Sequence, residues 1–147
     1  MRMIPFTSDG YKKLQEKQAE LTKKREEVVV RLQAAREMGD LSENGAYKAA
    51  RFELSDTDRE LRRLAYLLKD GQVISPRHDG IVGLGNTVTV KNDAGKVFSY
   101  LIVGTYEADP LKGKVSVESP MGMGLQGKRI NEIVEVREKR FTITRVS

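Results

Sequence analysis

The chain has 147 residues, a formal net charge of +5 and 32% charged residues, enough for one ordinary domain or two small ones. It contains no cysteine, which excludes disulfide bonds, a thiolate nucleophile and a zinc ribbon. No apolar run approaches a membrane span and the N-terminus lacks a signal-peptide core, so we expect a cytoplasmic protein without a membrane partner. Basic and acidic residues are mixed in both halves, so any nucleic-acid contact should be local.

The first expected element is a long helix that begins at about Ser8, with Thr7 or Ser8 as its N-cap. Its apolar residues recur every seven positions, which predicts a seam against a second helix. The seam consists of Leu14, Leu21, Val28 and Ala35, with Tyr11, Gln18, Arg25 and Leu32 at the companion positions. Gln18 and Arg25 interrupt its apolar character.

The second expected helix ends at about Lys69, before Asp70-Gly71, and its seam alternates spacings of three and four. The seam residues are Tyr47, Ala50, Leu54, Thr57, Leu61, Leu64 and Leu68. Gly39 can supply the left-handed turn that ends the first helix, and the short connection makes the helices antiparallel neighbours. Arms of about 28 residues would project on the order of 40 Å.

The pattern of the chain changes after Asp70. Gly71 to Gly80 is expected to be a linker, and strand-like runs follow it. They are Thr87–Lys91, Val97–Val103, Lys114–Glu118, Ile133–Arg137 and Phe141–Val146, with a short serine-capped helix from Ser119-Pro120 to before Gly127. We expect an α+β chain with an antiparallel coiled-coil hairpin at residues 1–75 and a small antiparallel β domain with one short helix at residues 76–147.

Two acidic residues, Asp40 and Glu43, lie where the chain reverses between the helices. Their carboxylates could bind a hard cation such as Mg²⁺, although two ligands make a poor site unless another macromolecule supplies the others. A metal completed in that way could activate water for phosphodiester hydrolysis. The alternative, favoured by the spacing alone, is a capping box in which Asp40 caps the second helix and Glu43 reaches back.

Basic residues flank the same turn. Arg36 precedes it, and Lys48 and Arg51 follow it, so these side chains could hold a phosphate backbone alongside the hairpin. Scattered Lys and Arg on long helices more often form a solvated charged face, which is the alternative interpretation. Tyr47 lies on the seam and is expected to pack rather than stack on a base.

Nothing elsewhere in the chain predicts a self-sufficient active site. The only histidine, His78, lies in the expected linker without a recognisable nucleophile beside it. Gly122, Gly124 and Gly127 near Lys128 lack the residue order of a phosphate-binding loop.

Two segments of the chain are similar to the motifs of a known family. Residues 35–44, followed by residues 47–51, closely resemble the hairpin tip of the GreA/GreB family, and residues 119–128 resemble the C-terminal signature of that family. The order of the motifs and the similarity of the intervening chain extend the match over nearly the full length. By appearance the chain is closer to GreA than to GreB.

The resemblance implies a transcription elongation factor that is not itself an enzyme. Its hairpin would enter the secondary channel of bacterial RNA polymerase, and its C-terminal domain, which would have an FKBP-like fold, would hold the channel rim. Asp40 and Glu43 would help the polymerase bind a second Mg²⁺, which the chain alone would not bind tightly. The polymerase would then cleave its own backtracked RNA, which rescues arrested complexes, and we expect the chain to act as a monomer.

The resemblance also implies roles for the flanking residues. Arg36, Lys48 and Arg51 would guide the 3′ end of the backtracked nascent RNA. The polymerase-docking residues would come from the C-terminal signature: Ser119, Pro120, Leu125, Gly127 and Lys128.

This chain departs from the family pattern in three places. Ala46 and Phe52 stand where relatives commonly carry acidic or polar residues, and the final hairpin around residues 137–139 is shorter than usual. A channel-binding inhibitor without cleavage activity is therefore the alternative function. Two weaker alternatives are a structural coiled-coil adaptor and a peptidyl-prolyl isomerase, whose apolar pocket would have to come from Phe98, Tyr100, Tyr106 and Phe141.

Overall fold

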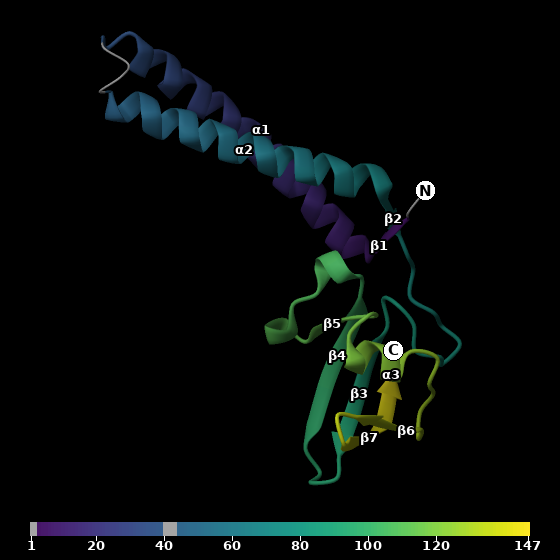
Figure 1. Cartoon of the computed structure of the whole chain (residues 1–147). Coiled ribbons are helices and arrows are strands. Elements are labelled where there is room, and N and C mark those ends of the chain that lie inside the picture. The colour runs from purple at the N-terminus through teal and green to yellow at the C-terminus, as the bar shows by residue number, and fades with distance from the viewer. Residues whose placement is uncertain (1–2, 40–43) are drawn as a thin grey trace. The chain divides into compact units, whose positions relative to one another are not determined.

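The computed structural model describes residues 3–39 and 44–147, and Figure 1 shows their helices and strands. The chain forms two compact units. One is a helical hairpin, Lys12–Asp70, and the other joins the chain up to Tyr11 with Gly71–Ser147. None of the helices in the described part is long and apolar enough to cross a membrane.

The hairpin is built from two long helices, α1 (Ser8–Arg36) and α2 (Gly45–Asp70). The predicted N-cap of α1 is confirmed, because the Thr7 hydroxyl accepts a hydrogen bond from the Gly10 amide at 3.0 Å. α2 ends at Asp70, as predicted from the Asp-Gly pair.

The predicted helix–helix seam is also confirmed. Except for Arg25, its residues are buried or half-buried. Val28 and Leu64 are almost fully buried, and so are Ala35 and Ala50 closer to the turn. Near the turn the almost fully buried seam residues are alanines, and Tyr47 is half-buried on the same seam.

Ion pairs between the helices show their register. Arg25, which interrupts the seam, places its Nε 2.6 Å from Asp58 Oδ1, and Arg31 Nη2 lies 2.9 Å from Glu53 Oε2. The hydrogen bond from Arg31 lowers the pKa of Glu53. Residue numbers rise along α1 as those of their partners fall along α2, so the helices are antiparallel. These pairs are exposed and add little stability, but they disfavour other registers.

The second unit begins with a small parallel sheet of β1 (Ile4–Phe6) and β2 (Gly71–Val73). This differs from the sequence analysis, which assigned the N-terminal residues to the hairpin and expected a linker to begin at Gly71. Each strand has only three residues, too few for a local pattern to reveal a partner so distant in sequence.

A carboxylate binds the first turn of α1 within this unit. Glu107 ends the 3₁₀ helix η1 (Thr105–Glu107) and accepts hydrogen bonds from the backbone amide of Thr7 at 2.9 Å and from the Thr7 hydroxyl. A side chain at Gly10 would collide with this carboxylate, because an added Cβ would lie 2.3 Å from Glu107 Cδ. A negative charge at this position also complements the N-terminal end of the helix dipole.

The larger sheet has the strand order β5-β4-β3-β7-β6. Its strands are β3 (Thr87–Asn92), β4 (Val97–Val103), β5 (Lys114–Ser116), β6 (Ile133–Val136) and β7 (Lys139–Val146). η2 (Pro110–Lys112) precedes β5, and α3 (Pro120–Leu125) lies between β5 and β6. All five predicted strands are present, but the expected all-antiparallel sheet is wrong for β5, which pairs with β4 in parallel.

The core of this unit contains Val82, Val88, Val90, Ile102, Leu125, Val134, Phe141 and Ile143. The strand residues among them follow the alternation expected of strands that bury one face. Leu125 joins them from α3, so this helix packs on the sheet through its last residue.

The short turn between β6 and β7 requires unusual backbone conformations. Val136 pairs with Lys139, and the residues between them, Arg137 and Glu138, have φ angles of 52° and 67°. Two consecutive positive φ angles match a type I′ turn, which favours Asn-Gly and disfavours residues with long side chains. The sequence analysis extended the strand to Arg137, whereas β6 ends one residue earlier.

This strain leads to a stability prediction. Replacing Arg137→Asn together with Glu138→Gly should raise the free energy of unfolding by about 1 kcal/mol, because both residues adopt left-handed conformations more readily. Urea unfolding followed by circular dichroism would measure the change. The control is Glu135→Gly, in an extended strand with no positive φ, which should lower stability. Unchanged or reduced stability in the Asn-Gly variant would contradict the prediction.

Candidate functional site

The predicted acidic pair, Asp40 and Glu43, lies outside the described residues. The chain is described on both sides of it, since α1 ends at Arg36 and α2 begins at Gly45. Gly39 has a φ of 109°, which confirms that a glycine takes the backbone conformation with positive φ after α1.

Asn44 is the N-cap of α2. Its side-chain Oδ1 accepts a hydrogen bond from the Tyr47 amide at 3.0 Å. The capping-box interpretation gave this role to Asp40, so the structure corrects it: α2 already has its cap. Asn44 was not predicted as the cap, although an Asn directly before a helical run is a recognisable start signal.

The predicted RNA-guiding residues have different surroundings. The Arg36 guanidinium lies over the Tyr47 ring, 5.8 Å from its centroid, so the end of α1 and the start of α2 share a cation–π contact. Tyr47 is half-buried on the seam, as predicted. Lys48 and Arg51 are exposed, and the described part of the chain shows no ion pair for either of them.

Two of the three expected departures from the family pattern, Ala46 and Phe52, lie on α2. Ala46 lines an apolar hollow of about 320 Å³ together with Ala34, Ala35, Met38, Ala49, Ala50 and the stem of Arg31. Phe52 is 77% exposed. Both residues therefore contribute apolar surface to the half of α2 nearer the turn.

The predicted docking segment forms the helix expected for it. The Ser119 hydroxyl accepts a hydrogen bond from the Gly122 amide at 3.1 Å, and Pro120 is the first residue of α3. Gly127 follows the helix with a φ of 81°. Leu125 is fully buried, so it would support docking by holding α3 against the core rather than by touching a partner.

The glycines of this segment serve close packing. A Cβ at Gly122 would lie 1.9 Å from the Ser116 carbonyl oxygen, and one at Gly124 would lie 2.9 Å from Val134 Cγ1. Both positions therefore bring α3 close to its neighbours. These contacts explain the glycine spacing without a phosphate-binding loop.

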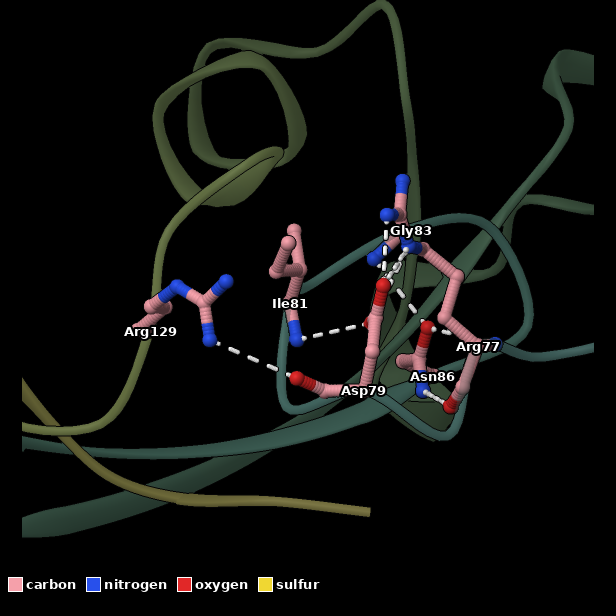
Figure 2. Close-up of polar contacts among 6 residues, drawn as sticks. All are labelled: Arg77, Asp79, Ile81, Gly83, Asn86 and Arg129. Carbon is pink, nitrogen blue, oxygen red and sulfur yellow. Dashed lines mark hydrogen bonds and ion pairs between the residues drawn. The ribbon is translucent and has the colours of Figure 1, made fainter.

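The segment before β3, expected to be a linker, forms an ordered loop around Asn86. Figure 2 shows that the buried Asn86 side chain accepts hydrogen bonds from the amides of Arg77 and Gly83, and donates one to the Arg77 carbonyl. It also donates to the Ser147 carbonyl at 3.2 Å. One side chain thus holds the loop closed and ties it to the end of β7.

This loop holds the C-terminal end of the docking segment. The Val82 amide donates to the Lys128 carbonyl at 2.9 Å, and the Gly127 amide donates to the Val82 carbonyl at 2.8 Å. Arg129 reaches the Asp79 carbonyl at 3.4 Å (Figure 2). The backbone of Gly127 and Lys128 is therefore fixed by residues that precede the sheet.

An exposed ion pair closes the loop itself. Arg77 Nη2 lies 2.6 Å from Asp79 Oδ2, and the Ile81 amide donates to Asp79 Oδ1 at 3.2 Å (Figure 2). The Arg77 hydrogen bond, followed by the Ile81 amide, lowers the pKa of Asp79 to about 2. Because the pKa falls on folding, the contact stabilises the folded chain above about pH 4 and is lost as the pH falls toward 2.

An apolar hollow of about 310 Å³ lies beside α3. Val115, Pro120, Met121, Val136 and Phe141 line it, with Ser119, Arg137 and Lys139. Of the four aromatic residues considered for a prolyl isomerase pocket, only Phe141 takes part. Phe98 stacks on Tyr100 and packs edge-to-face against Phe141, with 6.2 Å between the ring centroids of Phe98 and Phe141. Phe98 and Tyr100 do not line the hollow, and Tyr106 is 51% exposed.

The described residues contain no cluster of three or more His, Cys, Asp or Glu side chains that could hold a metal ion. The chemistry of the acidic pair still suits Mg²⁺, since both residues offer carboxylate oxygens, the ligand type this cation prefers.

Both parts of the chain match known family models. Residues 4–73 match the N-terminal domain of transcription elongation factors, and residues 77–147 match the C-terminal domain of the GreA/GreB transcription elongation factors. The helical hairpin and the β-rich unit therefore define a transcription elongation factor.

Similar proteins named transcription elongation factor GreA occur in several bacteria. The one from Staphylococcus epidermidis is 41% identical over 138 residues, which cover 92% of this chain and 87% of that protein. The one from Bacillus subtilis is 40% identical over 141 residues, 92% and 88% of the two chains. The chain belongs to the GreA/GreB family.

A solved structure of the transcription factor Gfh1 has a related fold. It is 23% identical in sequence and has a TM-score of 0.50, and the match covers 99% of this chain and 97% of the Gfh1 chain. The similarity supports the arrangement of a helical hairpin followed by a β-rich unit with one short helix.

The Arg77–Asp79 pair leads to a prediction on pKa values. In Arg77→Gln, the pKa of Asp79 should rise from about 2 toward its ordinary value of 3.8, because the strongest hydrogen bond to the carboxylate is lost. NMR titration of the Asp79 carboxyl carbon would measure it. Arg59→Gln, which removes a different exposed ion pair, should leave this titration unchanged. A value that stays at about 2 in Arg77→Gln would assign the shift to the backbone amides instead.

Proposed function

We propose that this chain binds bacterial RNA polymerase through its secondary channel and stimulates the polymerase to cleave backtracked nascent RNA. Family membership over both units supports the partner. The observation that carries the proposal is the position of Asp40 and Glu43 in the sequence, between the end of α1 and the start of α2. The start of α2 already has its cap in Asn44. The proposed partner also implies that the chain works in the cytoplasm.

The dimensions of the hairpin support entry into a channel. α1 has 29 residues and α2 has 26, which corresponds to a projection of about 40 Å. The two helices are joined by one narrow seam and exposed ion pairs. Such a structure buries little surface of its own, and its length is best explained by a need to reach a distant site.

The acidic pair would act on a metal that the polymerase shares with it. Asp40 and Glu43 would hold Mg²⁺ together with ligands from the polymerase, and the metal would supply water activation and charge stabilisation. Because Asn44 supplies the cap of α2, the carboxylates are not required for that role. Hydrolysis would add water across a phosphodiester bond and leave a new 3′-hydroxyl on the retained RNA.

The basic residues near the turn would guide the extruded RNA. Lys48 and Arg51 are exposed and could contact phosphates, whereas Arg36 is held against Tyr47 and would present its guanidinium from a fixed position. The docking surface would be formed by Ser119, Pro120 and Lys128 on the β-rich unit, with Leu125 and Gly127 fixing its backbone.

The test is RNA cleavage in a stalled, backtracked elongation complex with Mg²⁺, in the presence or absence of the purified chain. The wild-type chain should accelerate shortening of the RNA from its 3′ end only when polymerase is present. Asp40→Asn with Glu43→Gln should reduce the stimulated rate on the order of 100-fold and leave polymerase binding within about twofold, since charge is removed and shape is kept.

A matched control distinguishes the effect of removing the tip carboxylates from the effect of losing negative charge elsewhere on the hairpin. Asp56→Asn with Glu60→Gln removes two exposed carboxylates from α2 and should leave cleavage unchanged. Parallel loss of binding and cleavage in the tip variant would assign the tip to docking. Slowed elongation without any stimulated cleavage by the wild-type chain would instead identify a channel-binding inhibitor.

A further inference from the structure

One side chain connects the two helices at the turn of the hairpin. Asn44 Oδ1 accepts a hydrogen bond from the Tyr47 amide at 3.0 Å, and Asn44 Nδ2 donates one to the Ala35 carbonyl at 2.6 Å. The first contact caps α2 and the second reaches the last turn of α1. Asn44 therefore bonds to both helices with a single planar group.

The orientation of the Asn44 amide follows from its partners. A backbone amide can only donate and a backbone carbonyl can only accept, so the oxygen must face Tyr47 and the nitrogen must face Ala35. A flipped side chain would lose both hydrogen bonds. An Asn side chain places an acceptor oxygen and a donor nitrogen on two separate atoms, so it can cap α2 and reach Ala35 at once, whereas Asp has no donor and Ser has a single, shorter hydroxyl.

A second contact that joins the helices at this end is the one between the Arg36 guanidinium and the Tyr47 ring. The last carbonyls of a helix have no intrahelical partner, and Asn44 satisfies that of Ala35. The seam residues at this end, Ala35 and Ala50, bury small side chains. Among the described residues, the ion pair between the helices closest to the turn is Arg31–Glu53, more than one helical turn away from Asn44 along each arm.

We propose that Asn44 is a positioning residue for cleavage: its amide fixes the distance between the end of α1 and the start of α2, and so sets how the segment carrying Asp40 and Glu43 is presented. This inference rests on the proposed function. Catalytic groups need placement within a fraction of an ångström, so an open turn lowers the reaction rate even when the factor is fully bound.

Two variants separate the hydrogen bond from Asn44 to Ala35 from the hydrogen bond that caps α2. Asn44→Ser and Asn44→Asp both keep an oxygen that can cap α2. An ionised Asp has no donor for the Ala35 carbonyl, and the Ser hydroxyl lies one bond closer to the backbone, so an oxygen that caps α2 does not also reach Ala35. Using both excludes an effect of the added charge in Asn44→Asp. The matched control is Asn92→Asp, because Asn92 uses its oxygen to accept from Lys96 in the β3–β4 turn, and the hydrogen bonds described for its side chain use no donor.

The rate of RNA cleavage is measured against factor concentration in the backtracked elongation complex. Both Asn44 variants should lower the maximal rate at saturating factor by on the order of tenfold or more. The concentration for half-maximal cleavage, which reports binding, should change less than about twofold. A residue that only supports folding would instead lower the melting temperature or weaken binding, and would leave the maximal rate at saturation unchanged.

A double-variant cycle tests whether Asn44 acts through the carboxylates. Adding Asn44→Ser to Asp40→Asn/Glu43→Gln should cause no further loss of the maximal rate, because nothing remains to be positioned. Additive losses would overturn the proposal, and so would wild-type maximal rates in both single Asn44 variants. If the wild-type chain itself fails to stimulate cleavage, the proposed function is what has failed.

Discussion

A two-helix hairpin has only one seam through which its arms can hold each other, and this constraint shapes the whole hairpin. Leu64 and Val28 fill the seam where its side chains are large, and the ion pairs of Arg25 and Arg31 show the register. Toward the turn the buried seam residues are alanines, and the helices are also joined by the hydrogen bonds of Asn44 and by the Arg36–Tyr47 contact. Each of these interactions holds a different part of the hairpin closed, and the proposed function accounts for its length.

In the β-rich unit, contacts with the core and with a neighbouring loop fix the predicted docking segment, residues 119–128. Gly122 lets α3 approach its neighbours closely, and Leu125 anchors it in the core. The loop closed by Asn86 then binds the backbone of Gly127 and Lys128. The predicted docking segment is thus supported from both ends by buried groups, which favours a preformed surface for the partner.

Local patterns predicted most of the fold. The seven-residue period located both helices, the alternation of apolar residues located the strands, and Ser119-Pro120 with Gly127 located α3. The contacts that the sequence did not reveal join distant segments: the pairing of β1 with β2, the parallel pairing of β5, and the Arg36–Tyr47 contact. Asn44 was missed because the acidic pair offered a plausible capping box, and only the start of α2 at Gly45 shows which residue is the cap.

The most direct measurement compares RNA cleavage by the full-length hairpin with cleavage by a shortened one. Deleting residues 18–24 from α1 and 59–65 from α2 removes one heptad from each arm, keeps the seam in register and shortens the hairpin by about 10 Å. Polymerase binding and stimulated RNA cleavage would be measured for the shortened chain. If the hairpin delivers an acidic tip to the polymerase active site, binding should persist while cleavage falls to the rate without factor. Full cleavage by the shortened chain would contradict that mechanism.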